Sequence, residues 1–295
     1  MANTLGGINL AAIAEQTLDY LGSQFFMLSA FTRDFSQDIR NRGASVTTRI
    51  PSSATVQDLS SGYSASDVTS TAKTVTLSNF KGFVTGFTDK EVSLVGNVDW
   101  LQRVFVEPAV EATCKSVADD LLALVTAANF PTPLTSTAAN FDSDDLADLA
   151  ASLSTAKVPK SLRSAMLLPT YNASLQKDAA IQDASAYGSS DAVRNHAAGM
   201  IHGFGIHEYE GIPNNGENLT GFVCHPCALL IAARTVAEPV TPRVQVLNTV
   251  DPKTGIPLQF RAWYDRDGGQ YKFSVGLLYG VAVGNTAALK RIISS

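Results

Sequence analysis

Polar and β-favouring residues dominate a long stretch near the start of the chain. Residues 45–58 and residues 73–86 form two β-rich segments, which the polar sequence LSSGYSASDVTST, residues 59–71, joins. A strand of such a length would reach roughly 45 Å, whereas a compact chain of this size has a radius of gyration of only about 19 Å. The pattern therefore predicts a hairpin that is too long to lie within its own domain and that pairs with another copy of the chain.

Helical periodicity follows this hairpin. The sequence from Thr88 to Glu91 matches a capping box, in which the Thr hydroxyl and the Glu carboxylate each bond an unpaired backbone N–H. Residues 96–97 are expected to interrupt the helix that starts there, and Pro108 is expected to kink any helix that contains it. From Pro108 to about residue 128, apolar residues recur every three or four positions, which predicts a long amphipathic helix against an ordinary core. The predicted core positions are Val110, Cys114, Val117, Leu121 and Leu124.

The middle of the chain mixes helix and strand signals after a proline-rich break at residues 130–133. Asp142 or Ser143 can cap a helix with an apolar face. Short apolar runs predict strands, and Pro226 is placed to begin a further helix. The expected strands are residues 165–168, 201–209 and 221–224, the expected helical segments are residues 10–28, 171–175 and 228–233, and residues 183–195 are expected to form a loop.

The last third of the chain is rich in β-favouring residues. Strands are predicted at residues 243–250, 258–264 and 271–283, with a hairpin turn at residues 265–269. Residues 287–293 fit either a helix or a strand. The fold class that follows is α+β, and strands from both ends of the sequence are expected to share one sheet.

The composition narrows the classes of function. Hydrophobic residues make up 45% of the 295 residues and charged residues 17%, as in globular rather than disordered proteins. A net charge of −5, without a stripe of lysine and arginine, argues against broad nucleic-acid binding. The apolar runs are far shorter than the roughly 18 residues of a membrane span, so no membrane partner is expected. Three cysteines provide no disulfide framework.

A group of His and Cys residues is the candidate site for chemistry. His202, His207, Cys224 and Cys227 are the ligand types of a zinc site, and the cysteines have CxxC spacing. Positions 202 and 207 differ by an odd number, however, so on one strand their side chains would point to opposite faces. Buried thiols and surface imidazoles are the competing interpretation. Without a complete nucleophile, dinucleotide or phosphate-binding motif, the sequence indicates no catalytic residue and no cofactor.

The order of these elements resembles the major capsid proteins of tailed bacteriophages, the coat fold of the Hong Kong 97 type. The hairpin at residues 45–86 corresponds to the extended loop of that family, and the helix at residues 108–128 looks like its spine helix. Residues 157–175 (KVPKSLRSAMLLPTYNASL) and 199–213 (GMIHGFGIHEYEGIP) are similar to the axial domain. Residues 258–283 (LQFRAWYDRDGGQYKFSVGLLYGVAV) resemble the returning strands of the peripheral domain.

The resemblance implies a division of the chain into five parts. These are an N-terminal arm (residues 1–43), an extended hairpin loop (44–87), a peripheral domain with the spine helix (88–130), an axial domain (131–240) and the return strands of the peripheral domain (241–295). Axial domains would meet at capsomer centres, extended loops would overlie a neighbouring subunit, and N-terminal arms would clasp adjacent subunits.

The function that the resemblance implies is structural rather than enzymatic. Many copies of the chain would form the pentamers and hexamers of an icosahedral shell, which encloses double-stranded DNA without sequence-specific binding. A separate scaffolding protein and a portal would take part in assembly, and a decoration protein is an open further partner. The expected location is the virion capsid, and the host cytoplasm during assembly. Two alternatives stay open: an encapsulin-type nanocompartment shell, and a zinc or Cys/His-dependent enzyme centred on the four residues at 202, 207, 224 and 227.

Charged and aromatic residues of the hairpin and of the C-terminal turn are candidates for the subunit interface, because charged groups at such contacts set register more than bulk stability. Some relatives crosslink through a lysine of the extended loop, but no motif assigns this role to either lysine of the predicted hairpin. The candidate interface residues are Arg49, Asp58, Tyr63, Lys73, Lys81 and Arg266.

Overall fold

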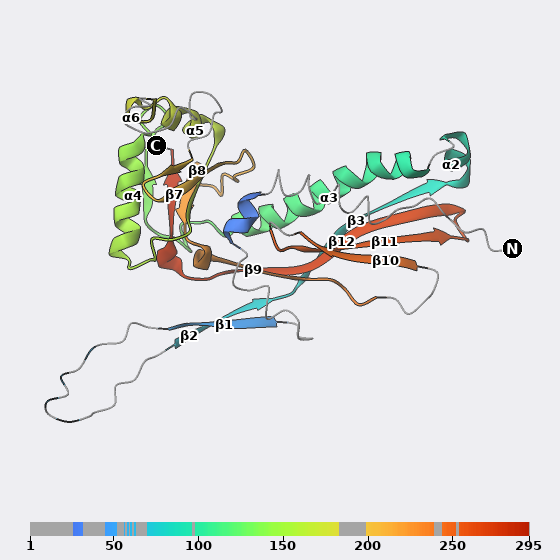
Figure 1. Ribbon diagram of the computed structural model, residues 1–295, viewed down its shortest axis with the longest axis horizontal. Helices are drawn as coiled ribbons and strands as arrows, with labels where there is room; N and C mark the ends of the chain where they lie inside the picture. The colour runs from blue at the N-terminus through green and yellow to red at the C-terminus, as the bar shows by residue number, and fades with distance from the viewer. Residues whose placement is uncertain are drawn as a thin grey trace.

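The computed structural model describes residues 26–31, 45–51, 56, 58, 60, 62, 70–95, 98–182, 199–238, 244–251 and 254–294. Most of the N-terminal arm and of the helix predicted at residues 10–28 lies outside these residues, as do the loop predicted at 183–195 and Tyr63. The described part of the chain is elongated, with a sheet at each end and the long helix α3 (Val98–Leu122) reaching from one to the other (Figure 1).

The first sheet joins strands from the two ends of the sequence. Its strands are β3 (Asn79–Thr88), β9 (Leu229–Arg234), β10 (Val244–Val250), β11 (Pro257–Asp265) and β12 (Gln270–Val283). They pair antiparallel in the order β10-β11-β12-β3, and β9 pairs with the C-terminal part of β12. Because β3 lies along β12 over its full length, the predicted sheet shared by both ends of the sequence is confirmed.

Helices α2 (Asp89–Val95) and α3 follow β3. The predicted capping box is confirmed, since the backbone N–H and the hydroxyl of Thr88 donate to a Glu91 carboxylate oxygen at 2.8 and 2.9 Å. The predicted core face of α3 is also confirmed. The four predicted core positions within the helix are buried, and Leu124, which follows the end of the helix, packs partly buried against the same core.

Helix α3 begins and ends earlier than predicted. Pro108 lies inside it at an exposed position, where its missing N–H removes one hydrogen bond without ending the helix. At the other end, the side-chain amide of Asn215 donates to the carbonyl oxygens of Leu122 and Val125 at 3.1 and 2.7 Å. The Leu122 carbonyl oxygen also accepts the N–H of Val125 at 3.0 Å, as in a 3-10 turn. The helix ends at Leu122 rather than near residue 128.

The second sheet is mixed. Its strands are β4 (Pro133–Thr135), β5 (Arg163–Leu167), β6 (Met200–Ile201), β7 (Phe204–Glu208), β8 (Leu219–Cys224) and β13 (Leu289–Ile293). Strands β5 and β8 are buried along their whole length. Their order is β4-β13-β8-β5-β7-β6, with β5 parallel to β7 and β4 parallel to β13. Helices α4 (Ser143–Thr155), α5 (Pro169–Gln176) and α6 (Ala179–Gln182) accompany this sheet (Figure 1). Asp142 caps α4, as predicted, by accepting from the N–H groups of Asp144 and Asp145.

Two predictions for the middle of the chain are wrong. The strand expected at residues 201–209 is a hairpin, because His202 and Gly203 adopt φ values of +48° and +84° and form the two-residue turn between β6 and β7. The helix expected at residues 228–233 is strand β9, preceded by the 3-10 turn η4 (Pro226–Ala228). An apolar run of this length fits a buried strand and a buried helix equally, and pairing with β12 decides the outcome.

Buried contacts tie the second sheet to the rest of the molecule. Leu28 and Phe31, within and just after the 3-10 helix η1 (Phe26–Ala30), are buried, and the Phe31 ring lies 6.3 Å from that of Phe222 in β8. Arg291 of β13, 2% exposed, forms an ion pair with Glu217 and donates from Nε to the Phe130 carbonyl oxygen at 2.7 Å. The described part of the N-terminal arm thus packs on its own chain. A last 3-10 turn, η5 (Thr286–Ala288), precedes β13.

Candidate assembly surfaces

The predicted hairpin is present but shorter than expected. Strands β1 (Ser45–Pro51) and β2 (Ser70–Thr76) pair antiparallel from Ser45↔Thr76 to Pro51↔Ser70. The second predicted arm, residues 73–86, divides at Leu77 and Ser78, and its second half belongs to β3 in the five-stranded sheet. The prediction of two long paired arms is therefore wrong, because β3 finds its partner in the C-terminal third of the chain.

The hairpin stands apart from the rest of the fold. In Figure 1, β1 and β2 form a separate ribbon below the five-stranded sheet. Among the strand residues of β1 and β2 whose burial is described, Val75 is the buried one. The four described positions between the strands are all exposed, and Val56 is 96% exposed. An apolar side chain so far from the core contributes nothing to the stability of this subunit.

The base of the hairpin is anchored on the five-stranded sheet. Val75 and Leu77 pack with Leu230 and Ala232 of β9 in a small apolar cluster of their own. A Cβ atom at Gly280 of β12 would overlap the carbonyl oxygen of Thr76, so the two backbones approach as closely as only glycine allows. The direction of the hairpin is therefore set by packing at its base.

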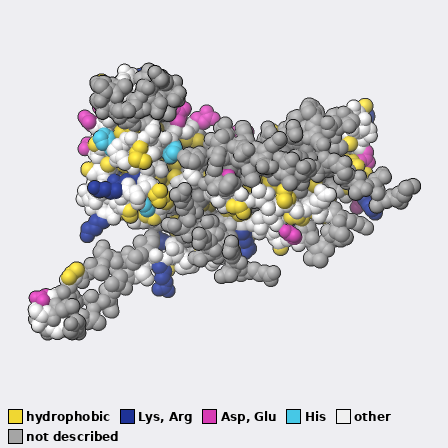
Figure 2. All heavy atoms as spheres, viewed as in Figure 1, with side chains coloured by type: hydrophobic (Ala, Val, Ile, Leu, Met, Phe, Trp, Pro, Cys, Tyr) yellow, Lys and Arg dark blue, Asp and Glu magenta, His cyan; other side chains and the backbone are white. Residues whose placement is uncertain are grey.

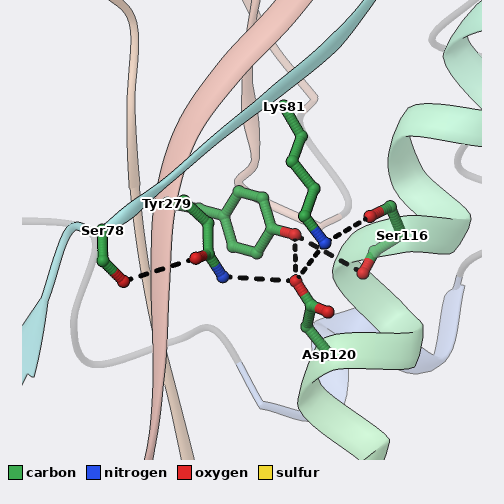
Figure 3. Close-up of polar contacts among 6 residues, drawn as sticks. Ser78, Lys81, Ser116, Asp120 and Tyr279 are labelled. Carbon is green, nitrogen blue, oxygen red and sulfur yellow. Dashed lines mark hydrogen bonds and ion pairs between the residues drawn. The ribbon is translucent and has the colours of Figure 1, made fainter.

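A polar cluster lies where the chain passes from β2 into β3 (Figure 3). Asp120 of α3 accepts hydrogen bonds from Lys81 Nζ at 2.7 Å, from Asn79 Nδ2 at 3.2 Å and from the hydroxyl of Tyr279. Lys81 also donates to Ser116 Oγ at 2.9 Å, and Ser78 donates to Asn79 Oδ1 at 3.4 Å. One carboxylate thus joins β3, β12 and α3 close to the point where the chain leaves the hairpin.

The pKa shifts of Lys81 and Asp120 in this cluster have the directions expected of an ion pair. The hydrogen bond to Asp120 raises the pKa of Lys81, although burial opposes that rise. Burial alone would raise the pKa of Asp120, but the hydrogen bonds from Lys81 and Tyr279 outweigh it and lower the pKa below the ordinary value. Burial, followed by the bond to Asp120, raises the pKa of Tyr279. Asp120 is therefore charged and Tyr279 neutral at pH 7.

The opposite face of the five-stranded sheet carries an apolar groove of about 500 Å³. Lys81 points to α3, so its neighbours Phe80 and Gly82 point to the other face. Gly82 and Gly276 lie opposite each other in the ladder and line the groove. Phe80 and Val84 stand on one side, 66% and 60% exposed, and Trp263 on the other. Large exposed apolar surfaces of this kind typically mark sites of association.

The structure does not gather the five described candidate interface residues into one surface, and Tyr63 lies outside the described residues. Arg49 and Asp58 are exposed, Lys73 is half-buried in β2, and Arg266 is exposed in the turn between β11 and β12. Lys81 lies in the polar cluster. Asp120 was not among the residues that the sequence pattern singled out. Its position beside the core residues Val117 and Leu121 was the signal that could have identified it.

The four residues of the alternative zinc site do not form one. His202 lies in the β6–β7 turn, and His207 of β7 is separated from Cys224 of β8 by strand β5. Within the described residues, which include all four, no group of three or more His, Cys, Asp or Glu side chains is placed to hold a metal ion.

The described side chains on the face seen in Figure 2 show no single dominant charge. Figure 2 shows basic, acidic and hydrophobic side chains interspersed over the visible face. Nor does any helix in the described ranges combine the length and the apolar character needed to cross a bilayer.

Solved structures match most of the chain. A chain of Mycobacterium phage Che8 is 19% identical, with a TM-score of 0.59 and 85% of each chain covered. The capsid structure of cyanophage P-SCSP1u gives 14% identity and a TM-score of 0.60 over 90% of this chain and 86% of that one. The mature capsid of bacteriophage PhiM1 gives 12% identity and a TM-score of 0.62 over 92% and 87%. Neither a protein-family model nor a curated protein sequence matches this chain.

These matches define the class of fold. The chain has the α+β capsid fold of tailed bacteriophages, the Hong Kong 97 type, over most of its length. The fold that the order of sequence elements led us to expect is confirmed. The sequence identities to these structures are too low for a comparison of sequences to establish it.

Proposed function

We propose that this chain is a major capsid protein, which self-assembles into the pentamers and hexamers of an icosahedral shell around double-stranded DNA. The observation that carries the proposal is the hairpin β1–β2, which extends a largely exposed two-stranded ribbon beyond the body of the subunit. A two-stranded hairpin alone is marginally stable in water. A shell supplies the missing contacts, because every hairpin then lies on the next subunit.

The apolar groove on the five-stranded sheet is the surface that we assign to a neighbouring copy. It presents large apolar side chains to solvent, and the loop between β1 and β2 presents Val56. Both surfaces lose exposed apolar area when one copy covers the other. Each contact can be weak, since every subunit engages several neighbours at once.

The six candidate interface residues are proposed to set register at these contacts. Arg49, Asp58, Tyr63 and Lys73 belong to the hairpin or its loop, and Arg266 belongs to the exposed β11–β12 turn. Exposed charges of this kind influence specificity and association rate more than affinity. Lys81 is proposed to act indirectly, because its ion pair with Asp120 holds strand β3, which follows the hairpin, in place.

The finer organisation is proposed from the resemblance. Under the five-part division of the chain, at residues 43, 87, 130 and 240, strands β4 to β8 of the second sheet belong to the axial domain and strands β10 to β12 of the first sheet to the return strands of the peripheral domain. The remaining strands of the two sheets, β3, β9 and β13, come from other parts of that division. A scaffolding protein and a portal act during assembly, with a decoration protein as a further partner. The net charge of −5 is compatible with a capsid shell that encloses DNA without binding it tightly.

The test is to shorten the hairpin while keeping its ladder. Replacing residues 52–69 by Asn-Gly supplies a two-residue turn of the type that suits antiparallel strands. We expect a soluble, folded subunit that forms no closed particles in negative-stain microscopy. A matched variant, in which the loop keeps its length but consists of Gly and Ser, separates the reach of the loop from its side-chain contacts. Normal shells from the shortened variant would contradict the proposal that the hairpin acts as a clamp on a neighbouring subunit.

An encapsulin-type nanocompartment is the second candidate, because the same fold would serve it. The contents of purified particles distinguish the two. A phage capsid requires scaffolding and portal partners and takes up DNA, whereas a nanocompartment copurifies with a folded cargo enzyme and needs neither partner.

A further inference from the structure

The CxxC motif at residues 224–227 has no part in the assembly surfaces. Its first cysteine, Cys224, ends strand β8 and is fully buried, and burial followed by the neighbouring Cys227 raises its pKa. The third cysteine of the chain, Cys114, is also fully buried, and burial followed by Asp251 raises its pKa to about 12. Cys227 differs from both, because it lies in η4 and is partly exposed. Solvent therefore reaches Cys227 more readily than the other two thiols.

Cys227 lies against an imidazole. His225 Nδ1 is 3.1 Å from Cys227 Sγ, and the same nitrogen accepts the backbone N–H of Cys227 at 3.3 Å. A nitrogen that accepts a hydrogen bond carries a lone pair rather than a proton. A thiol proton can move to that lone pair, and the thiolate that remains is the nucleophilic form of cysteine.

The backbone around Cys227 is fixed by the neighbouring turn. The Cys227 carbonyl oxygen accepts from the N–H of Asn285 at 2.9 Å, and the Ala228 carbonyl oxygen accepts from the N–H of Gly284 at 2.9 Å. A Cβ atom at Gly284 would overlap the Cys227 carbonyl oxygen. These contacts fix the backbone that carries the thiol, and the hydrogen bond from the Cys227 N–H holds the His225 ring beside it.

We propose that Cys227 is a covalent modification site for small-molecule disulfides, with His225 as the base. The thiol proton moves to His225 Nδ1, and the Cys227 sulfur attacks one sulfur atom of the disulfide. The disulfide bond breaks, a new sulfur–sulfur bond forms at Cys227, and the leaving thiolate takes the proton from the imidazolium. One mixed disulfide and one small thiol result, so the disulfide is the sole oxidant. Cys224 remains a thiol, because its buried sulfur does not reach the reagent.

The test treats the full chain with oxidised glutathione, followed by intact mass and peptide mapping. We expect one glutathione per chain, attached at Cys227, and none after Cys227→Ser. The second variant is His225→Asn, whose side-chain oxygen can still accept the Cys227 N–H, as asparagine does at helix starts, but which offers no base. Its rate with an aromatic disulfide at neutral pH should fall at least about tenfold, and its pH profile should follow the ionisation of an ordinary thiol, at about pH 8.5, instead of the wild-type profile.

Three results would overturn the proposal: attachment at Cys114 or Cys224 of the folded chain, an internal Cys224–Cys227 disulfide, or an unchanged rate and pH profile after His225→Asn. Loss of folding does not mimic success, because an unfolded chain exposes every thiol: His225→Asn would then take up three glutathione groups and Cys227→Ser two, instead of one and none. The wild-type labelling pattern decides the site independently of either variant.

Discussion

Gly280 of β12 lies against the carbonyl oxygen of Thr76, and this contact fixes the base of the hairpin on the five-stranded sheet. A side chain at residue 280 must push the end of β2 away and open the apolar cluster around Val75. Gly280→Ala should therefore destabilise the subunit by about 1–3 kcal/mol, with a lower Tm in thermal unfolding.

The matched control for this prediction lies on the same strand. A Cβ atom at Gly276 would make ordinary contacts, the nearest at 3.5 Å from the Lys81 carbonyl oxygen. Gly276→Ala should leave the Tm close to that of the wild type. Equal Tm values for both variants would contradict this prediction, because the hairpin base would then accommodate the added methyl group without a loss of stability.

Local signals in the sequence identified most elements but not their partners. The capping box at Thr88, the cap at Asp142 and the apolar stripe of α3 depend on neighbours within a turn or two, and all three are present. The pattern of β3 indicated a strand, yet its partner β12 lies in the C-terminal third. The helix predicted at residues 228–233 was wrong for the same reason, because an apolar run does not show whether a neighbouring strand will pair with it.

The candidate site was predictable to a smaller extent. The exposed hairpin and its polar character were evident from composition, whereas its true length depends on the point where the chain turns at Leu77 and Ser78. Lys81 was chosen for its charge, but Asp120 and Tyr279, which hold it, come from two other elements. Only the folded chain brings these three side chains together.

Removing the charge of Asp120 should weaken the junction of hairpin, sheet and α3. In Asp120→Asn, Lys81 loses its carboxylate partner, although Lys81 is exposed enough for water to take part of its place. We expect a loss of about 1–2 kcal/mol in the free energy of unfolding. The neighbouring exposed residue gives the control, since Asp119→Asn changes the net charge equally and should cost less than about 0.5 kcal/mol.

The same carboxylate predicts a dependence on acid. The folded state holds the pKa of Asp120 below its ordinary value of 3.8. Its stabilisation is therefore complete above that pH and is lost as the pH falls through the lower folded value. Unfolding free energies measured at decreasing pH should converge for wild type and Asp120→Asn. A gap that stays constant down to the acid limit would contradict the ion pair.

The buried thiol of Cys114 leads us to expect that the folded chain loses stability at alkaline pH. Its ordinary pKa of 9.0 is raised to about 12 in the folded chain. Between these values the unfolded thiol is ionised while the folded thiol keeps its proton, so stability falls as pH rises, by up to about 1.4 kcal/mol per pH unit. Cys114→Ala should reduce this slope in urea unfolding of the unassembled chain. The small cavity adds an offset that does not depend on pH, so an unchanged slope would refute the prediction.

Filling the groove should separate folding from assembly. Gly276 lines the groove, and its Cβ position meets only ordinary contacts, the nearest side-chain atom being a ring carbon of Phe80 at 3.9 Å. Gly276→Leu can therefore place its side chain in the groove without disturbing the backbone. We expect a subunit with nearly unchanged Tm that sediments as unassembled protein and forms no closed particles, while Gly276→Ala still forms shells. Because the hairpin is intact in both variants, normal shells from Gly276→Leu would exclude the groove as the receiving surface and leave the clamp itself untouched.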